Sequence, residues 1–217
     1  MSAPQPARSP GRVVLEGRYV RLEPLAEAHA EDLLTAARVP DATERFRYLP
    51  SDPPADLAAM RDWIARAASS GDPILFALVD RQTGRAGGWQ QFMRIVPEHG
   101  VIELGYIYWG PGVARTRLAT EALYLAARHV FDDLGYRRFE WKCNAANAPS
   151  RRAAERFGFV YEGTFRQHMI VRGENRDTAW FSMLDGDWPR LRAAYERWLD
   201  PSNFEADGTQ KSKLQVR

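Results

Sequence analysis

The chain of 217 residues (24.7 kDa) has 45% hydrophobic and 27% charged residues, which suits a single globular domain. Its 30 Lys and Arg residues nearly balance 28 Asp and Glu residues, and the net charge of +2 argues against a nucleic-acid partner. One cysteine, Cys143, excludes a disulfide framework and a thiolate zinc site, the histidines lack an H-x-x-x-H pair, and no apolar run reaches the roughly 20 residues of a membrane span.

Composition divides the chain into a central domain and two tails. Residues 1–12 are rich in Pro, Ser and Arg and predict a disordered N-terminal tail. Residues 201–217 are polar and predict a flexible C-terminal tail. Residues 13–200 are then expected to form one domain, which holds no metal and lies in the cytoplasm.

The first half of this domain alternates short strand patterns with helix patterns. Val13–Leu15 and Tyr19–Leu22 flank a Gly-Arg pair and predict a hairpin. Apolar residues at helical spacing predict helices over Ala26–Arg38 and Ala55–Ser69, and the Pro-rich stretch Val39–Pro54 between them predicts a loop. Three further segments are expected to be strands: Ile74–Val79, Gly88–Ile95 and Val101–Trp109.

The second half begins with a long amphipathic helix pattern near Arg117–Leu134, which Gly135 ends as a cap. Asn147 is the expected N-cap of a shorter helix, with Pro149 in the first turn and an end near Phe157. Strands are expected at Arg138–Cys143, Phe159–Phe165 and Thr178–Leu184, and a last helix at Trp188–Leu199. This order predicts an α/β fold with a mixed sheet.

Five short motifs follow one another between residues 103 and 163. They are Glu103-Leu104-Gly105-Tyr106, Ala119-Thr120-Glu121-Ala122, Asn147-Ala148-Pro149-Ser150, Gly158-Phe159 and Glu162-Gly163. Each is weak alone, but their order and spacing resemble the GNAT superfamily of N-acetyltransferases, most closely its ribosomal-protein N-terminal acetyltransferase branch. The resemblance covers about residues 13–188. It implies an acyl-CoA N-acyltransferase fold with a splayed central sheet, and acetyl-CoA as the acyl donor.

The segment that enters the long helix is the expected phosphate-binding loop, because backbone N–H groups and the helix dipole favour a pyrophosphate there. Where the family has Q/R-x-x-G-x-G/A, this chain reads A-R-T-R-L-A, so Ala114 and Arg117 depart from the pattern. The Arg117 side chain either crowds the turn or, together with Arg115, contacts the phosphates through guanidinium groups. Two solvated arginines are the structural alternative.

The resemblance also implies how the rest of acetyl-CoA is bound. The pantetheine arm is expected to add beside the strand at Gly105–Tyr108, where a bulge at Gly105 splays two strands apart. The residues expected to contact acetyl-CoA are Tyr106, Ile107, Tyr108, Arg115, Thr116, Arg117, Leu118, Ala119, Thr120, Asn144 and Asn147.

Three residues are candidates for the chemical step. By the resemblance, Ser150 lies near the thioester sulfur and protonates the leaving thiolate, with a plain N3 position in the helix as the structural alternative. Glu103 is the best acidic candidate for the base, with a cross-strand ion pair as its alternative. The branch can carry a glutamate where this chain has Met169, and the neighbouring His168 is a second candidate, because histidines titrate near neutral pH. Deprotonation through ordered water also stays open.

The strand at Arg138–Cys143 carries charges that we interpret as structural. Arg138, Glu140 and Lys142 share one face of it and predict a solvated charge ladder. Cys143 is expected to be an inert core thiol.

The acceptor is expected to be a small-molecule amine or a protein N-terminus, and the departures from the family pattern favour the small molecule. Its pocket is expected to be lined by Phe46, Tyr48, Trp89, Phe92 and Tyr106. A homodimer is compatible with this interpretation. The alternative is a non-catalytic acyl-CoA-binding or regulatory module with the same fold. Modification of a nucleic acid is a third hypothesis, which the low net charge disfavours.

Overall fold

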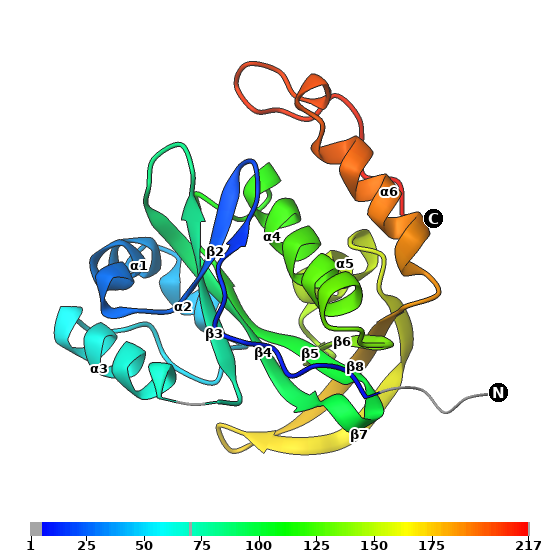
Figure 1. Cartoon of the computed structure of the whole chain (residues 1–217). Helices are drawn as coiled ribbons and strands as arrows, with labels where there is room; N and C mark the ends of the chain where they lie inside the picture. Colours follow the sequence, from blue (N-terminus) through cyan, green and yellow to red (C-terminus); the bar gives the residue numbers. More distant parts are fainter. Residues whose placement is uncertain (1–5, 70, 217) are drawn as a thin grey trace. The chain divides into compact units, whose positions relative to one another are not determined.

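Figure 1 shows the computed structural model, which describes residues 6–69 and 71–216. The strands form an eight-stranded mixed sheet in the order β1-β2-β3-β4-β5-β6-β8-β7, which confirms the predicted α/β class. The chain divides into two compact units. Of the described residues, 11–69, 71–94 and 104–126 belong to the N-terminal unit, and 6–10, 95–103 and 127–216 belong to the C-terminal unit. The tail prediction for residues 1–5 lies outside the described residues.

The N-terminal unit contains the predicted hairpin, an antiparallel sheet and four helices. Its elements are β1 (Leu15–Glu16), β2 (Val20–Pro24), the 3-10 turn η1 (Glu27–His29), α1 (Ala30–Ala37), α2 (Ala42–Phe46), α3 (Leu57–Ala68), β3 (Ile74–Asp80), and most of β4 (Ala86–Val96), β5 (Val101–Trp109) and α4 (Arg117–Arg128). The expected loop at Val39–Pro54 is wrong in one part, because it contains α2. This short helix forms because it buries Phe46 in the core.

Alternation along β4 determines what covers each face of the sheet in this unit. Trp89 packs into the apolar core with Leu33 of α1 and Ile64 of α3. The next residue, Gln90, points to the other face and donates from Nε2 to the Ala122 carbonyl of α4 at 3.3 Å. In the N-terminal unit, α1 and α3 therefore cover one face and α4 covers the other.

The C-terminal unit contains the second half of the sheet. Its elements are the 3-10 turn η2 (Pro97–His99), the start of β5, the π-helical turn η3 (His129–Asp133) that ends α4, β6 (Arg138–Asn144), α5 (Ala148–Arg156), β7 (Val160–Val171), β8 (Glu174–Leu184), α6 (Trp188–Leu199) and η4 (Pro201–Asn203). β5 runs parallel to β6, with a register from Val101–Arg138 to Glu103–Glu140. β6 pairs with β8 and β8 with β7, both antiparallel.

The β7–β8 hairpin is longer than predicted, because β7 continues past Phe165 to Val171. Its register shifts twice, between Tyr161 and Gly163 and between Phe165 and Met169. The second shift is a bulge in which Gln167 has a φ of +48° and its N–H donates to a carboxylate oxygen of β8 at 2.7 Å. The bulge interrupts the side-chain alternation from which strand ends are predicted.

The segments near the termini make specific contacts in the C-terminal unit. The Trp198 indole of α6 donates to Gln210 Oε1 at 3.1 Å and to the Ser212 carbonyl at 3.0 Å, and Leu214 is buried. Near the other end, the Ala7 N–H donates to a carbonyl of η2 at 3.0 Å. Within residues 6–69 and 71–216, none of the helices is both long and apolar enough to cross a membrane.

Candidate functional site

The loop before α4 is closed by its own hydrogen bonds. The Ala114 N–H donates to the Gly110 carbonyl at 2.8 Å, and the Thr116 N–H to the Val113 carbonyl at 3.2 Å. The Thr116 hydroxyl oxygen then accepts from the Leu118 N–H at 3.1 Å, which is the bond of a helix N-cap. The loop therefore delivers the chain directly into the first turn of α4, and its binding of a phosphate stays a prediction.

The two arginines of this loop differ in what they do. Arg115 has a φ of +63°, a left-handed conformation that glycine adopts most easily. The loop therefore requires a left-handed residue at position 115. Arg117 is the first residue of α4, and its guanidinium carbon lies 4.3 Å from the centroid of the Tyr19 ring. Arg117 thus begins the helix and stacks on Tyr19 of the β1–β2 hairpin.

Glu121, in the Ala-Thr-Glu-Ala motif, connects α4 to the same hairpin. Its carboxylate accepts backbone N–H bonds from Arg18 at 2.7 Å, Tyr19 at 2.6 Å and Val20 at 2.7 Å. A Cβ atom on Gly17 would lie 2.6 Å from this carboxylate, so only glycine fits there. This role of Glu121 was not predicted from the sequence. The signal that could have revealed it is a glutamate on the buried side of an amphipathic helix.

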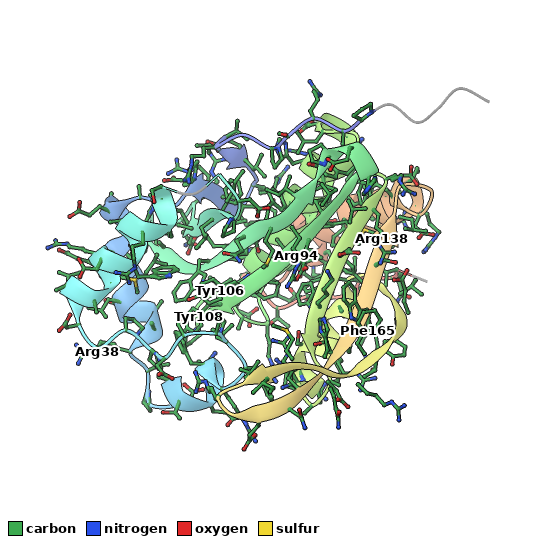
Figure 2. The ribbon with its side chains drawn as sticks, turned by 90° about the horizontal axis from the view of Figure 1, so that it is seen from below. Arg38, Arg94, Tyr106, Tyr108, Arg138 and Phe165 are labelled. Atoms are coloured by element: carbon green, nitrogen blue, oxygen red, sulfur yellow. The ribbon has the colours of Figure 1, made fainter. Side chains whose placement is uncertain are left out.

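The backbone of β5 departs from extended geometry at Tyr106, one residue after the position where the bulge was predicted, because Tyr106 and not Gly105 has a positive φ, +45°. Figure 2 labels the Tyr106 side chain. The Tyr106 hydroxyl bonds the Ser51 hydroxyl at 2.7 Å, and the Tyr108 hydroxyl donates to a carbonyl of α1 at 2.7 Å. Burial raises the pKa of Tyr106, and raises that of Tyr108 to about 12. Both phenols are therefore neutral at physiological pH.

Most of the residues expected to line the acceptor pocket lie in the core. Phe46, Trp89 and Phe92 are each 1% exposed. The Trp89 ring stacks on Tyr108 with centroids 4.5 Å apart. Tyr48 is half-buried, and apart from Tyr106 it is the most accessible of the predicted pocket residues. Their contact with an acceptor stays a prediction.

The start of α5 fixes the Ser150 side chain. Asn147 Oδ1 accepts from the Ser150 N–H at 3.1 Å, which confirms the predicted N-cap. The Trp141 Nε1–H donates to Ser150 Oγ at 3.0 Å. Asn144 Oδ1 accepts from the Ala146 N–H at 2.9 Å. Sequence reasoning missed Trp141, although strand alternation places it on the same face of β6 as Cys143.

The charges on β6 form a buried network, so the expected solvated ladder is wrong. Lys142 Nζ lies 3.0 Å from a Glu103 oxygen and 2.8 Å from a Glu140 oxygen, and the Lys142 and Glu103 side chains are 7% and 4% exposed. The Lys142 ammonium also lies 3.7 Å from the Trp180 ring centroid, which shields it from water. Glu103, a candidate base, is therefore held in the cross-strand ion pair that was its structural alternative.

The same network continues towards β7. Arg138 donates to Glu140 at 2.8 Å and, from both terminal nitrogens, to Glu162 at 2.8 Å and 2.6 Å (Figure 2 labels Arg138). Hydrogen bonds from Arg138 lower the pKa of Glu162 to about 2, against the smaller effect of its desolvation.

His168 lies on the exposed β7–β8 hairpin, within the bulge between Phe165 and Met169. Its Nδ1 is 3.0 Å from the Thr178 hydroxyl, and its ring is perpendicular to that of Phe165 with centroids 5.4 Å apart. Ser150, Glu103 and His168 thus have separate partners in the C-terminal unit, and their catalytic roles stay predictions. In the described part of the chain, no group of three His, Cys, Asp or Glu residues is placed to hold a metal ion.

Comparisons with known proteins identify the family. A model of the acetyltransferase (GNAT) domain matches residues 20–160. A GCN5-related N-acetyltransferase from Brucella melitensis is 54% identical and has a TM-score of 0.94 over 97% of this chain and 96% of that one. A probable GNAT-family acetyltransferase from Chromobacterium violaceum is 38% identical, with a TM-score of 0.80 over 87% and 94%. The chain therefore belongs to the GNAT family of N-acetyltransferases and has its mixed α/β fold.

More distant structures share the fold alone. The ribosomal L7/L12 α-N-protein acetyltransferase RimL is 18% identical, with a TM-score of 0.68 over 79% of this chain and 94% of that one. The microcin C7 self-immunity acetyltransferase MccE, solved with acetyl-CoA and AMP, is 18% identical, with a TM-score of 0.68 over 77% and 93%. The predicted resemblance to a ribosomal-protein acetyltransferase is thus found at the level of the fold.

Proposed function

We propose that the protein transfers the acetyl group of acetyl-CoA to a primary amine, on a small molecule or at a protein N-terminus, by direct attack in a ternary complex. The observation that carries the proposal is the Ser150 hydroxyl. It is fixed in the first turn of α5 by Asn147 through the backbone and by Trp141 through the side chain. The buried thiol of Cys143 fits the cytoplasm as the compartment of this reaction.

The N-terminal unit supports the binding of an anionic donor. α4 has twelve residues, and the partial positive charge at its N-terminus favours a phosphate group. Arg115 and Arg117 add two cations in the loop and the first turn. A phosphate competes with the Tyr19 ring for Arg117, because a charge-assisted hydrogen bond is stronger than a cation–π contact at an exposed site.

Apart from the proton transfers, the reaction makes one bond and breaks one. The amine nitrogen bonds to the acetyl carbonyl carbon, and the carbon–sulfur bond breaks with its electron pair on sulfur. Ser150 gives its hydroxyl proton to that sulfur and is reprotonated from solvent. The proton that the amine loses passes to a base or to water, so the products are an amide and CoA.

The contacts favour His168 over Glu103 as the proton acceptor. Taking up a proton would break the ion pair of Glu103 with Lys142, which leaves the ammonium of Lys142 buried with one partner fewer. His168 is exposed and has one ring nitrogen bonded to Thr178, which orients the ring. The alternative is that the amine loses its proton directly to water. A His168→Gln variant distinguishes the two cases, because its activity would be unchanged if water takes the proton.

The test is a CoA-thiol release assay with acetyl-CoA and a panel of polyamines, amino sugars, amino-acid amides and peptides with free N-termini. Ser150→Ala should lower kcat about 100-fold on the best amine and change the KM for acetyl-CoA less than twofold, since acid catalysis contributes about 10²–10⁴-fold. Ser69→Ala, at the exposed end of α3, is the control and should match the wild type.

A thermal shift separates binding from turnover. Acetyl-CoA at about 100 times its Kd should stabilise the protein by about 2.7 kcal/mol, which raises the Tm by roughly 5–11 °C. A raised Tm without thiol release with any amine would overturn the proposal of an enzyme and support a non-catalytic acyl-CoA-binding module. An unchanged Tm would overturn both.

A further inference from the structure

We infer that Trp141 is a positioning residue, which holds the Ser150 hydroxyl oxygen as an acceptor so that the hydroxyl proton is available to the reacting sulfur. The inference rests on the proposed function, because it assigns a helper to the proposed proton donor. Trp141 itself is 4% exposed and takes no direct part in the chemistry.

The hydrogen-bond roles in this contact are fixed by the chemistry of the two groups. An indole N–H is a donor only, whereas a serine hydroxyl has one proton and two acceptor lone pairs. In the 3.0 Å bond between Trp141 Nε1 and Ser150 Oγ, the serine oxygen must therefore be the acceptor. The indole occupies one lone pair of the oxygen and leaves the hydroxyl proton available to another acceptor.

The second neighbour of Ser150, the Cys143 thiol, is only a weak competitor for that proton. Within residues 6–69 and 71–216, the hydroxyl has the side chains of Trp141 and Cys143 as its partners. Burial raises the pKa of the Cys143 thiol, so it stays neutral, and a neutral thiol is a weak donor and a weak acceptor. A thiolate leaving from a thioester is a stronger acceptor and takes the proton in preference.

Serine hydroxyls in the body of a helix commonly donate to a backbone carbonyl in the preceding turn, which ties up the proton. Ser150 stands in the first turn of α5, so no helical turn precedes it. Here an external donor points at the oxygen, and accepting its bond polarises the hydroxyl and makes it a better donor. The bond also stabilises the negative charge that develops on the oxygen as the proton leaves.

Packing keeps the indole at this place. The Trp141 ring lies 5.7 Å from the Phe159 ring and 6.3 Å from the Phe157 ring, measured between centroids. The direction of its N–H is thus set by the core and not by the hydroxyl it serves. Trp141→Phe keeps an aromatic ring in this packing and removes the donor, which makes it the informative variant.

The test compares Trp141→Phe with a matched variant, using acetyl-CoA and the best amine of the panel. Trp141→Phe should lower kcat about tenfold and change the KM for acetyl-CoA less than twofold. The control is Trp198→Phe, which also removes a buried indole donor, bonded to Gln210 and Ser212, and should leave kcat unchanged. Added to Ser150→Ala, Trp141→Phe should lower kcat no further, because the two residues act as a unit.

Two results would overturn the inference: a kcat of Trp141→Phe within twofold of the wild type, or losses in the double variant that multiply. Failure of the proposed function itself looks different, because the wild type would then release no thiol with any amine.

A second measurement needs no Trp141 variant to fold. In ¹H–¹⁵N spectra, the Trp141 indole signal should move in Ser150→Ala and when acetyl-CoA saturates the wild type. A signal that moves in neither case contradicts the inference.

Discussion

The contact between α4 and the β1–β2 hairpin yields a quantitative prediction for Glu121→Gln. The carboxylate is 4% exposed and accepts three backbone N–H bonds, one on Oε1 and two on Oε2. A glutamine can keep its oxygen at the Oε2 position and retain the bonds from Tyr19 and Val20. Its NH₂ group then faces the Arg18 N–H, and two donors oppose each other.

The cost follows from these three bonds. The Arg18 N–H loses its acceptor, which costs about 1–3 kcal/mol for a partly buried group. The remaining two bonds lose their charge assistance, which costs roughly 1 kcal/mol more. The free energy of unfolding should therefore fall by about 2–4 kcal/mol. For a protein of this length, that lowers the Tm by roughly 4–16 °C.

Calorimetry or urea denaturation measures this loss directly. Glu155→Gln is the matched control, because Glu155 is an exposed glutamate on the helix α5, and its Tm should change by less than about 2 °C. A Tm of Glu121→Gln within 2 °C of the wild type would refute the reasoning, since the three bonds would then contribute nothing that a neutral side chain cannot replace.

Three further changes test other features. Lys142→Met leaves two carboxylates buried without their shared cation and should cost about 3–5 kcal/mol in urea denaturation. Arg115→Gly should raise the free energy of unfolding by up to about 1 kcal/mol, because a glycine adopts the φ of +63° without strain; a loss would contradict this. Since Arg138 holds the pKa of Glu162 near 2, below its ordinary 4.5, that carboxylate stabilises the fold fully above pH 4.5 and progressively less as the pH falls towards 2. Urea midpoints of Glu162→Gln should therefore fall less steeply than those of the wild type over that range.

Elements with a clear hydrophobic period and strong end signals were predictable from the sequence. β5 and α6 begin and end where expected, at Val101–Trp109 and Trp188–Leu199, because glycines flank the strand and a proline stands in the first turn of the helix. The helix α2 was not predictable, because five residues are too few to show a helical period. The N-cap role of Asn147 was predictable, because it depends on local sequence alone.

The residues of the candidate site were harder to predict where their state depends on other strands. Arg138, Glu140 and Lys142 alternate along β6 as solvated charges do. Their burial depends on the Trp180 ring and on Glu103, which come from β8 and β5. No local pattern encodes that environment. For the same reason, the donor that Trp141 offers to Ser150 is visible only once α5 is packed on β6.

The irregular course of β7 has a consequence for how the molecule behaves at high concentration. β7 is the last strand of the sheet, and the side chains of Val160, Phe165 and Ile170 on it are exposed. A long, flat edge strand with exposed apolar side chains is a template onto which a strand of another molecule can add. The shifts after Tyr161 and at Gln167 divide its free N–H and C=O groups into short runs. The irregular strand can thus expose an apolar sheet edge without offering a continuous surface for edge-to-edge polymerisation.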